Sequence, residues 1–97
     1  MAIEVIKCGQ VLGIVELEEL YPRLLSLLLE EKSIVFDGGD VEQVDTAALQ
    51  LLHAFVKEAK IHGHRVHWQS VSDIFLQSAR VLGMAHLMNN GGLLNVD

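Results

Sequence analysis

Thr46 is the residue whose type and position best suit a chemical change. It closes an acidic segment that begins at Asp37 and contains four carboxylates, and it opens a predicted helix. A phosphate added to a hydroxyl there would face unpaired backbone N–H groups and the positive end of the helix dipole. It would also bring about two negative charges to an already acidic surface. The segment therefore predicts a site that tolerates phosphorylation and, once phosphorylated, repels an acidic partner.

Asp45 and Thr46 also have a purely structural interpretation. Either side chain could accept a hydrogen bond from a first-turn amide and cap the helix, which is worth about 1 kcal/mol. A capping threonine on a surface rim can still be a kinase substrate, so both interpretations stay open. The carboxylates of Asp37, Asp40, Glu42 and Asp45 could instead gather around a divalent cation. A solvated acidic rim is the favoured interpretation of these four residues.

Five histidines are the second unusual feature of the chain: His53, His62, His64, His67 and His86. His62 and His64 flank Gly63 and His67 follows three residues later, a spacing that could bring two imidazoles to one metal ion. No second cysteine accompanies Cys8. Turn and strand-edge histidines without a ligand role are therefore favoured, and we expect neither a metal nor a cofactor. A small His-rich metal-binding protein remains an alternative.

Known catalytic patterns do not occur in this sequence. It has no nucleophile elbow, and Gly38-Gly39 lacks the lysine and the glycine spacing of a phosphate-binding loop. The sequence therefore predicts a binding protein rather than an enzyme.

The elements that position the acidic segment follow from the spacing of apolar residues. Residues 3–5 and 11–15 predict two short strands joined as a hairpin by a turn near residues 8–10. A helix is predicted from Tyr21 or Pro22 to Glu31, because proline is tolerated in a first helical turn and disrupts later ones. This start would leave Glu18 and Glu19 ahead of the helix.

Alternating strands and helices follow in the second half of the chain. Residues 33–37 predict a buried central strand, and residues 46–62 predict the longest helix, which ends at Gly63. A strand over 65–69 precedes a third helix, about 71–82, which Ser70 and Asp73 open as a capping box. The order strand-helix-strand-helix indicates an α/β fold with a partly parallel sheet and right-handed crossovers. The helical stripe predicted to be buried consists of Leu49, Leu52, Val56 and Ala59.

Length and composition narrow the classes of protein. Ninety-seven residues suit one domain over 1–97, and 51% hydrophobic residues supply a core. A formal net charge of -6 makes nucleic acid an unexpected partner. The longest leucine-rich run, residues 24–29, is too short to insert into a membrane, and the amino terminus has no pattern of a secretory signal. We therefore expect a cytoplasmic protein, with residues 89–97 either loosely docked or disordered.

The segment around Thr46 resembles the signature of STAS domains, the family that includes bacterial anti-sigma factor antagonists. In that signature a strand ending in Asp leads through spaced aliphatic residues to Asp-Ser-Ser/Ala-Gly at a helix start. Asp37 matches the strand-end Asp, Asp45 the motif Asp and Thr46 the phosphorylatable Ser or Thr, while Val41 and Val44 match the aliphatic positions. The resemblance covers about residues 33–88 well and the first 32 only in layout. It departs at Ala48, where the family often has Gly, and at Thr46, where Ser is commoner.

The resemblance implies a STAS-type mixed, partly parallel sheet of about four to five strands packed by three to four helices. It also implies a non-enzymatic partner-switching module in signal transduction, with Thr46 phosphorylation weakening docking. Its partner would be an anti-sigma factor, a serine/threonine kinase or a chemotaxis histidine kinase. The run over residues 41–52 most resembles that of small STAS proteins encoded with chemotaxis kinases, which favours the last of these partners. The alternative is a cytoplasmic subunit of a phospholipid-transport ABC complex, bound to the transporter ATPase. A homodimer is a further alternative.

The predicted contact surface is the loop and helix around Thr46. Leu51 and Phe55 lie one turn apart and off the buried stripe, so they either contact a partner or pack under a neighbouring helix. The full predicted partner-binding set is Asp37, Gly39, Asp45, Thr46, Ala47, Ala48, Leu51 and Phe55.

Overall fold

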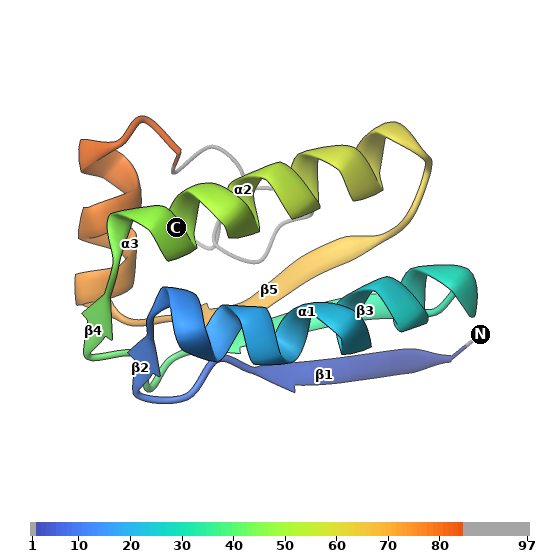
Figure 1. The fold of residues 1–97 in the computed structure, drawn as a ribbon, viewed down its shortest axis with the longest axis horizontal. Coiled ribbons are helices and arrows are strands. Elements are labelled where there is room, and N and C mark those ends of the chain that lie inside the picture. Colours follow the sequence, from blue (N-terminus) through green and yellow to red (C-terminus); the bar gives the residue numbers. More distant parts are fainter. Residues whose placement is uncertain (1, 85–97) are drawn as a thin grey trace.

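Three parallel strands and three helices make up most of the described chain (Figure 1). The computed structural model describes residues 2–84. In chain order the elements are β1 (Ile3–Lys7), β2 (Val11–Leu12), α1 (Ile14–Leu29), β3 (Ser33–Gly38), β4 (Gln43–Val44), α2 (Thr46–Ile61), β5 (Val66–Val71) and α3 (Asp73–Val81).

The main sheet has the order β1-β3-β5, and a second, two-stranded sheet pairs β2 with β4. Ile3 is opposite Ser33 and Ile34 is opposite Val66, and every pairing among the described residues is parallel. Adjacent parallel strands need a crossover connection, and in this sheet each connection contains a helix. Helix α1 lies between β1 and β3 in the chain, and α2 lies between β3 and β5. The prediction of an α/β fold of four to five strands with β3 buried at its centre is confirmed.

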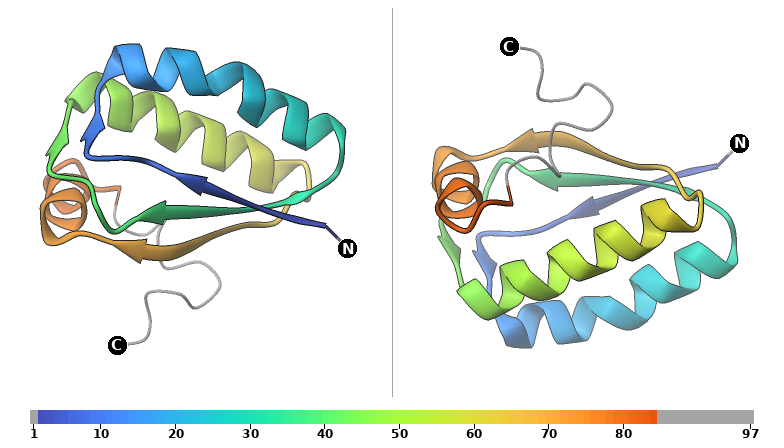
Figure 2. Two further views of the ribbon diagram at one scale, coloured as in Figure 1. Left: turned by 90° about the horizontal axis from the view of Figure 1, so that it is seen from below. Right: turned by 90° about the horizontal axis from the view of Figure 1, so that it is seen from above.

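Helices α1 and α2 lie side by side on one face of the three-stranded sheet, and α3 lies across its end (Figure 2). The buried stripe of α2 predicted from the sequence is confirmed. Gly63 follows α2 with a φ of +83°, the left-handed conformation expected there. Under the helices, the ring of Phe36 stacks on Trp68 with centroids 4.9 Å apart.

The predicted hairpin between β1 and β2 is wrong. Gly9, with a φ of +79°, does turn the chain, but the turn leads β2 away from the main sheet to pair with β4. Residues 14 and 15 belong to α1 rather than to a strand. Alternating apolar residues indicate a strand without indicating its partner, and β1 takes β3 as its partner.

The predicted start of α1 is also wrong. The helix begins at Ile14 and continues through Pro22, so Glu18 and Glu19 lie inside it rather than ahead of it. Pro22 is exposed and cannot donate a hydrogen bond to the carbonyl of Glu18. An earlier start buries Leu17 completely, which offsets the lost bond.

The start of α3 lies two residues beyond the prediction. Ser70 belongs to β5, and the helix is capped by Ser72, whose hydroxyl accepts a hydrogen bond from the backbone N–H of Phe75 at 3.1 Å. Gly83 follows the helix with a φ of +72°. The prediction for residues 89–97 lies outside the described residues.

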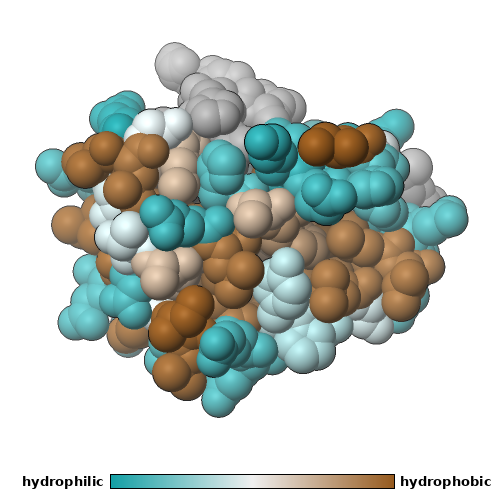
Figure 3. Space-filling view, turned by 45° about the horizontal axis from the view of Figure 1, so that its top comes forward, coloured by the Kyte–Doolittle hydropathy of each residue, from teal (hydrophilic) through white to brown (hydrophobic). Residues whose placement is uncertain are grey.

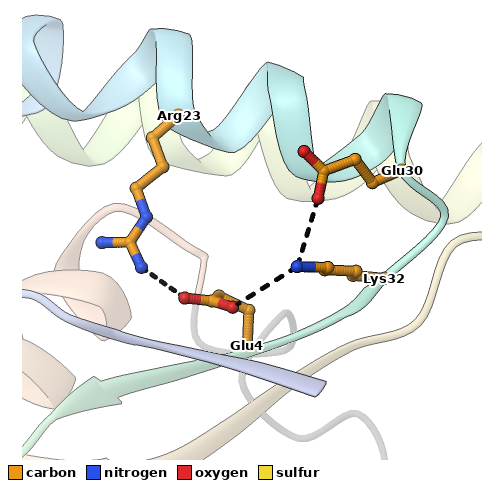
Figure 4. Close-up of polar contacts among 4 residues, drawn as sticks. All are labelled: Glu4, Arg23, Glu30 and Lys32. Carbon is orange, nitrogen blue, oxygen red and sulfur yellow. Dashed lines mark hydrogen bonds and ion pairs between the residues drawn. The ribbon is translucent and has the colours of Figure 1, made fainter. Parts of the chain in front are cut away.

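A surface ion-pair network joins β1 to α1 (Figure 4). The carboxylate of Glu4 pairs with Arg23 and lies 3.9 Å from Nζ of Lys32, which is also 3.2 Å from a carboxylate oxygen of Glu30. Exposed pairs of this kind contribute about 0–1 kcal/mol each. No helix within residues 2–84 is long and apolar enough to cross a membrane.

Candidate functional site

Thr46 is the first residue of α2 and is exposed. Asp45 occupies the N-cap position in an extended conformation, but its side chain makes no capping bond to α2. Its Oδ2 instead accepts a hydrogen bond from the backbone N–H of Ile14, the first residue of α1, at 3.4 Å. The prediction that Asp45 caps its own helix is therefore corrected: its carboxylate meets the start of the neighbouring helix.

This contact depends on a close approach of Gly13 to the two acids beside it. A Cβ at Gly13 would stand 3.2 Å from Oδ2 of Asp45 and 2.6 Å from Oε1 of Glu16. Both α1 and α2 begin at the same end of the molecule (Figure 1), so two positive helix ends face these carboxylates.

Asp37 organises the loop that leads to Thr46. Its Oδ1 accepts hydrogen bonds from the backbone N–H of Gly39 at 3.0 Å and from the hydroxyl of Ser70 at 2.8 Å. These donors, with the Gly39 amide first, hold the pKa of Asp37 below its usual value. A Cβ at Gly39 would stand 2.6 Å from Oγ of Ser70, so a larger residue at this position would displace the Ser70 hydroxyl. Asp37 and Gly39 therefore position the loop.

The rest of the loop is fixed to the fold by one buried side chain and by two backbone hydrogen bonds. Val41 is buried in the core, while Asp40 and Glu42 are exposed. The backbone N–H groups of Glu42 and Gln43 both donate to the carbonyl of Gln10, at 2.8 and 3.1 Å. The chain therefore reaches Thr46 along a fixed path that leaves the carboxylates in solvent.

A groove of about 310 Å³ separates the start of α2 from α3. Thr46 lies on one wall, and the other wall carries Ile74 and Val81, whose side chains are 47% and 79% exposed. Apolar residues reach the surface on the side of the molecule where α3 lies, at the left of Figure 3. The complete lining is Val44, Asp45, Thr46, Leu49, Ile74, Gln77, Ser78, Val81 and Leu82.

Sequence reasoning missed the α3 wall of this groove. The signal was the spacing of Ile74, Gln77, Ser78 and Val81, which follows one helical face over two turns. The spacing of residues within α3 does not reveal that this face of the helix lies opposite the start of α2.

Two residues of the predicted contact set are corrected by their burial. Ala48 is 0% exposed and Phe55 is 2% exposed. The ring of Phe55 meets Tyr21 of α1 edge-on, with centroids 5.8 Å apart, so Phe55 packs under the neighbouring helix. Ala47 is exposed and Leu51 half-buried, so these two remain accessible.

The histidines and the cysteine form no metal centre in the described range. Residues 2–84 contain no group of three or more His, Cys, Asp or Glu side chains that could hold a metal ion. Nδ1 of His62 lies 3.0 Å from the carbonyl oxygen of Glu58 in its own helix. Burial, with the nearby charge of Asp37, raises the pKa of Cys8 to about 12. His86 lies outside the described residues.

Fold and site together define a parallel α/β domain with an exposed threonine beside an apolar groove. The chain matches the family model described as "Mlab, STAS domain" over residues 5–94, and it therefore belongs to the STAS domain family. STAS domains are generally non-enzymatic and commonly mediate protein–protein interactions. Comparison with the curated proteins and with the solved structures gave no significant match.

Proposed function

We propose that the protein is a partner-switching module of signal transduction that docks on a kinase-like protein through the loop before β4 and the start of α2. Thr46 is the switch, and its phosphorylation weakens docking. The observation that carries the proposal is the position of Thr46, exposed at a helix N-terminus and on the wall of an apolar groove. The kinase-like partner is an anti-sigma factor, a serine/threonine kinase or a chemotaxis histidine kinase.

The local electrostatics support Thr46 as a site that accepts a phosphate. The first turn of α2 contains no acidic side chain, so its unpaired amides are available to a phosphate. The dianion would nevertheless stand beside an apolar groove, where a docking partner would have to remove its water. Desolvating a charge without full pairing costs several kcal/mol. The fold therefore tolerates the modification while the docked complex does not.

The test is affinity purification of the tagged protein from its native cells, with mass spectrometry of the copurifying proteins and of the Thr46 peptide. We expect a kinase-like partner and a fraction of the protein phosphorylated at Thr46. The partner should be lost in Thr46→Glu, and the phosphate should be lost in Thr46→Ala. Thr46→Ser is the matched control and should keep both. A partner retained by Thr46→Glu would overturn the proposal.

Thr46 and Ala48 stand where the family signature has Ser and Gly. Both substitutions resemble those in STAS subunits that do not regulate sigma factors, including the cytoplasmic subunit of phospholipid-transport ABC complexes, and so they favour a second candidate function. In this candidate the domain is a permanent subunit bound to a transporter ATPase, and Thr46 is a contact that is never phosphorylated. Recovery of an ATPase with an unmodified Thr46 peptide would select this candidate. Loss of the ATPase in Thr46→Glu would then show that Thr46 contacts the ATPase, without implying that Thr46 is phosphorylated.

A further inference from the structure

We infer that the groove between α2 and α3 receives an amphipathic helix of a partner protein, with Leu- or Ile-type side chains on one face and Lys or Arg beside them. This inference deepens the proposed docking site by stating the chemistry of the partner, and it rests on that proposal.

The shape of the groove indicates a helix as its occupant. Ile74, Gln77, Ser78 and Val81 form the i, i+3, i+4, i+7 face of α3, and two of them are large apolar residues exposed to solvent. This stripe extends for two turns, or about 10 Å. An exposed helical stripe beside a second wall is the geometry in which an amphipathic helix lays its apolar side chains into a groove.

The charges around the groove indicate a basic occupant. Its nine described lining residues include one acid, Asp45, and no base. Exposed acids also stand at Asp40 and Glu42 in the preceding loop and at Asp73 in the first turn of α3. The sequence has no Lys or Arg from residue 33 to residue 56. Helix α3 also contributes one exposed base, Arg80, in its last turn. Lys or Arg beside the apolar face of the partner would therefore pair with the carboxylates at the starts of the two helices, Asp45 and Asp73, rather than near the end of α3.

This partner chemistry changes the expected role of a phosphate on Thr46. The sequence alone predicts repulsion of an acidic partner, whereas the groove fits a basic one. Exposed ion pairs between the rim and the partner stabilise the complex only weakly, whereas removing water from a phosphate beside apolar side chains is costly. Desolvation therefore outweighs attraction, and the phosphate still weakens docking.

The experiment titrates three synthetic 18-residue peptides into the 15N-labelled full chain and follows backbone amides by NMR. The first peptide repeats Leu at helical spacing with Lys elsewhere, the second replaces Lys by Glu, and the third replaces Leu by Ser. We expect the Leu/Lys peptide to shift the amides of Thr46 and of residues 74–82, and both other peptides to bind at least tenfold more weakly.

Variants separate the groove from general attraction to an acidic protein. Ile74→Ser with Val81→Ser should weaken the Leu/Lys peptide at least tenfold, whereas Leu25→Ser with Leu29→Ser, exposed on α1, should leave its affinity unchanged. Asp40→Asn with Glu42→Gln should weaken it several-fold, more than Glu30→Gln with Glu58→Gln at the other end of the helices. Amide shifts centred elsewhere, or equal binding of the Leu/Glu peptide, would overturn the inference.

Other occupants have distinct signatures. Nuclear Overhauser contacts between the methyl groups of Ile74 or Val81 and residues 85–97 of the same chain, in the free protein, would overturn the inference. So would a doubled mass in sedimentation that returns to the monomer value in the Ile74→Ser, Val81→Ser variant. If the peptide fails to bind while Thr46→Glu still releases the cellular partner, this inference falls and the proposed function stands. If the peptide binds in the groove while Thr46→Glu retains that partner, the proposed function falls.

Discussion

Asp37 illustrates how one carboxylate can position a functional loop from a distance. It does not touch Thr46, but its bonds to Gly39 and Ser70 connect the loop that follows β3 to the neighbouring strand β5. A carboxylate that accepts hydrogen bonds is more acidic when folded than when unfolded. Its contribution to stability is therefore dependent on pH.

Asp37→Asn should be less stable than the wild type at pH 7, and the difference should shrink as the pH falls below the usual carboxyl pKa of about 3.9. The lowered pKa in the folded state means that stability is present above the unfolded value of about 3.9 and is lost as pH falls through the folded value. Urea denaturation of both proteins at several pH values measures the difference. Asp40→Asn, which removes an exposed carboxylate from the same loop, is the control, and a pH-independent difference for Asp37→Asn would contradict the prediction.

Cys8 should be almost unreactive in the native protein. With a pKa of about 12, the fraction of thiolate at pH 8 is on the order of 10⁻⁴, far below that of a free cysteine. Iodoacetamide labelling followed by mass spectrometry should proceed at least tenfold faster in denaturant than in buffer. Equal rates would show that Cys8 is not buried in solution.

At the scale of elements, the start of α1 was decided by packing in the core rather than by the local preference of proline for a first helical turn. Its start at Ile14 tolerates Pro22 in the ninth helical position because the first turns bury Leu17. Without that burial we would expect the helix to begin at Tyr21 or Pro22, as the sequence alone predicts.

Pro22→Ala should raise the free energy of unfolding by about 1–2 kcal/mol. Alanine restores the hydrogen bond to the carbonyl of Glu18 and removes the ring, and part of the gain is offset by a more flexible unfolded chain. Urea denaturation measures the change. Ser26→Ala, also exposed on α1, controls for helix propensity and should change stability by no more than about 0.5 kcal/mol. A destabilised Pro22→Ala would show that the ring packs against the fold.

Sequence patterns predicted the elements of this chain better than their partners. The central strand β3, the helix α2 and the left-handed Gly63 were all predicted, because each depends on a local signal. The hairpin was wrong because strand partners depend on long-range packing. The cap of α3 was predicted at Ser70, which instead pairs with Asp37 within β5, while Ser72 caps the helix.

The candidate site divides in the same way. The position of Thr46 at a helix start, after an acidic loop, was readable from residue types. The groove was not, because its second wall comes from α3, about 30 residues further along the chain. The burial of Phe55 likewise depends on how α1 lies against α2, where its ring meets that of Tyr21.

At the scale of the whole molecule, one core holds the helices on the sheet, and Leu52 is buried in it. Leu52→Ala should lower the free energy of unfolding by about 2–5 kcal/mol, because it removes apolar contacts and leaves a cavity. Leu29→Ala, at a side chain that is 87% exposed, should change it by no more than about 0.5 kcal/mol. Thermal or urea denaturation of both variants measures the difference, and equal effects would mean that the core is misassigned.

The parallel pairing of every described strand has a consequence for how the chain folds. The strands that pair lie on the order of 30 residues apart, as Ile3 and Ser33 do, so no pair can form before an intervening helix has been made. Such contacts close long loops and slow the search for the native state. During synthesis β1 must wait for β3, and β3 keeps one of its two edges unpaired until β5, which ends at Val71, has left the ribosome. Helices α1 and α2, which need only local contacts, are therefore the elements available to begin folding.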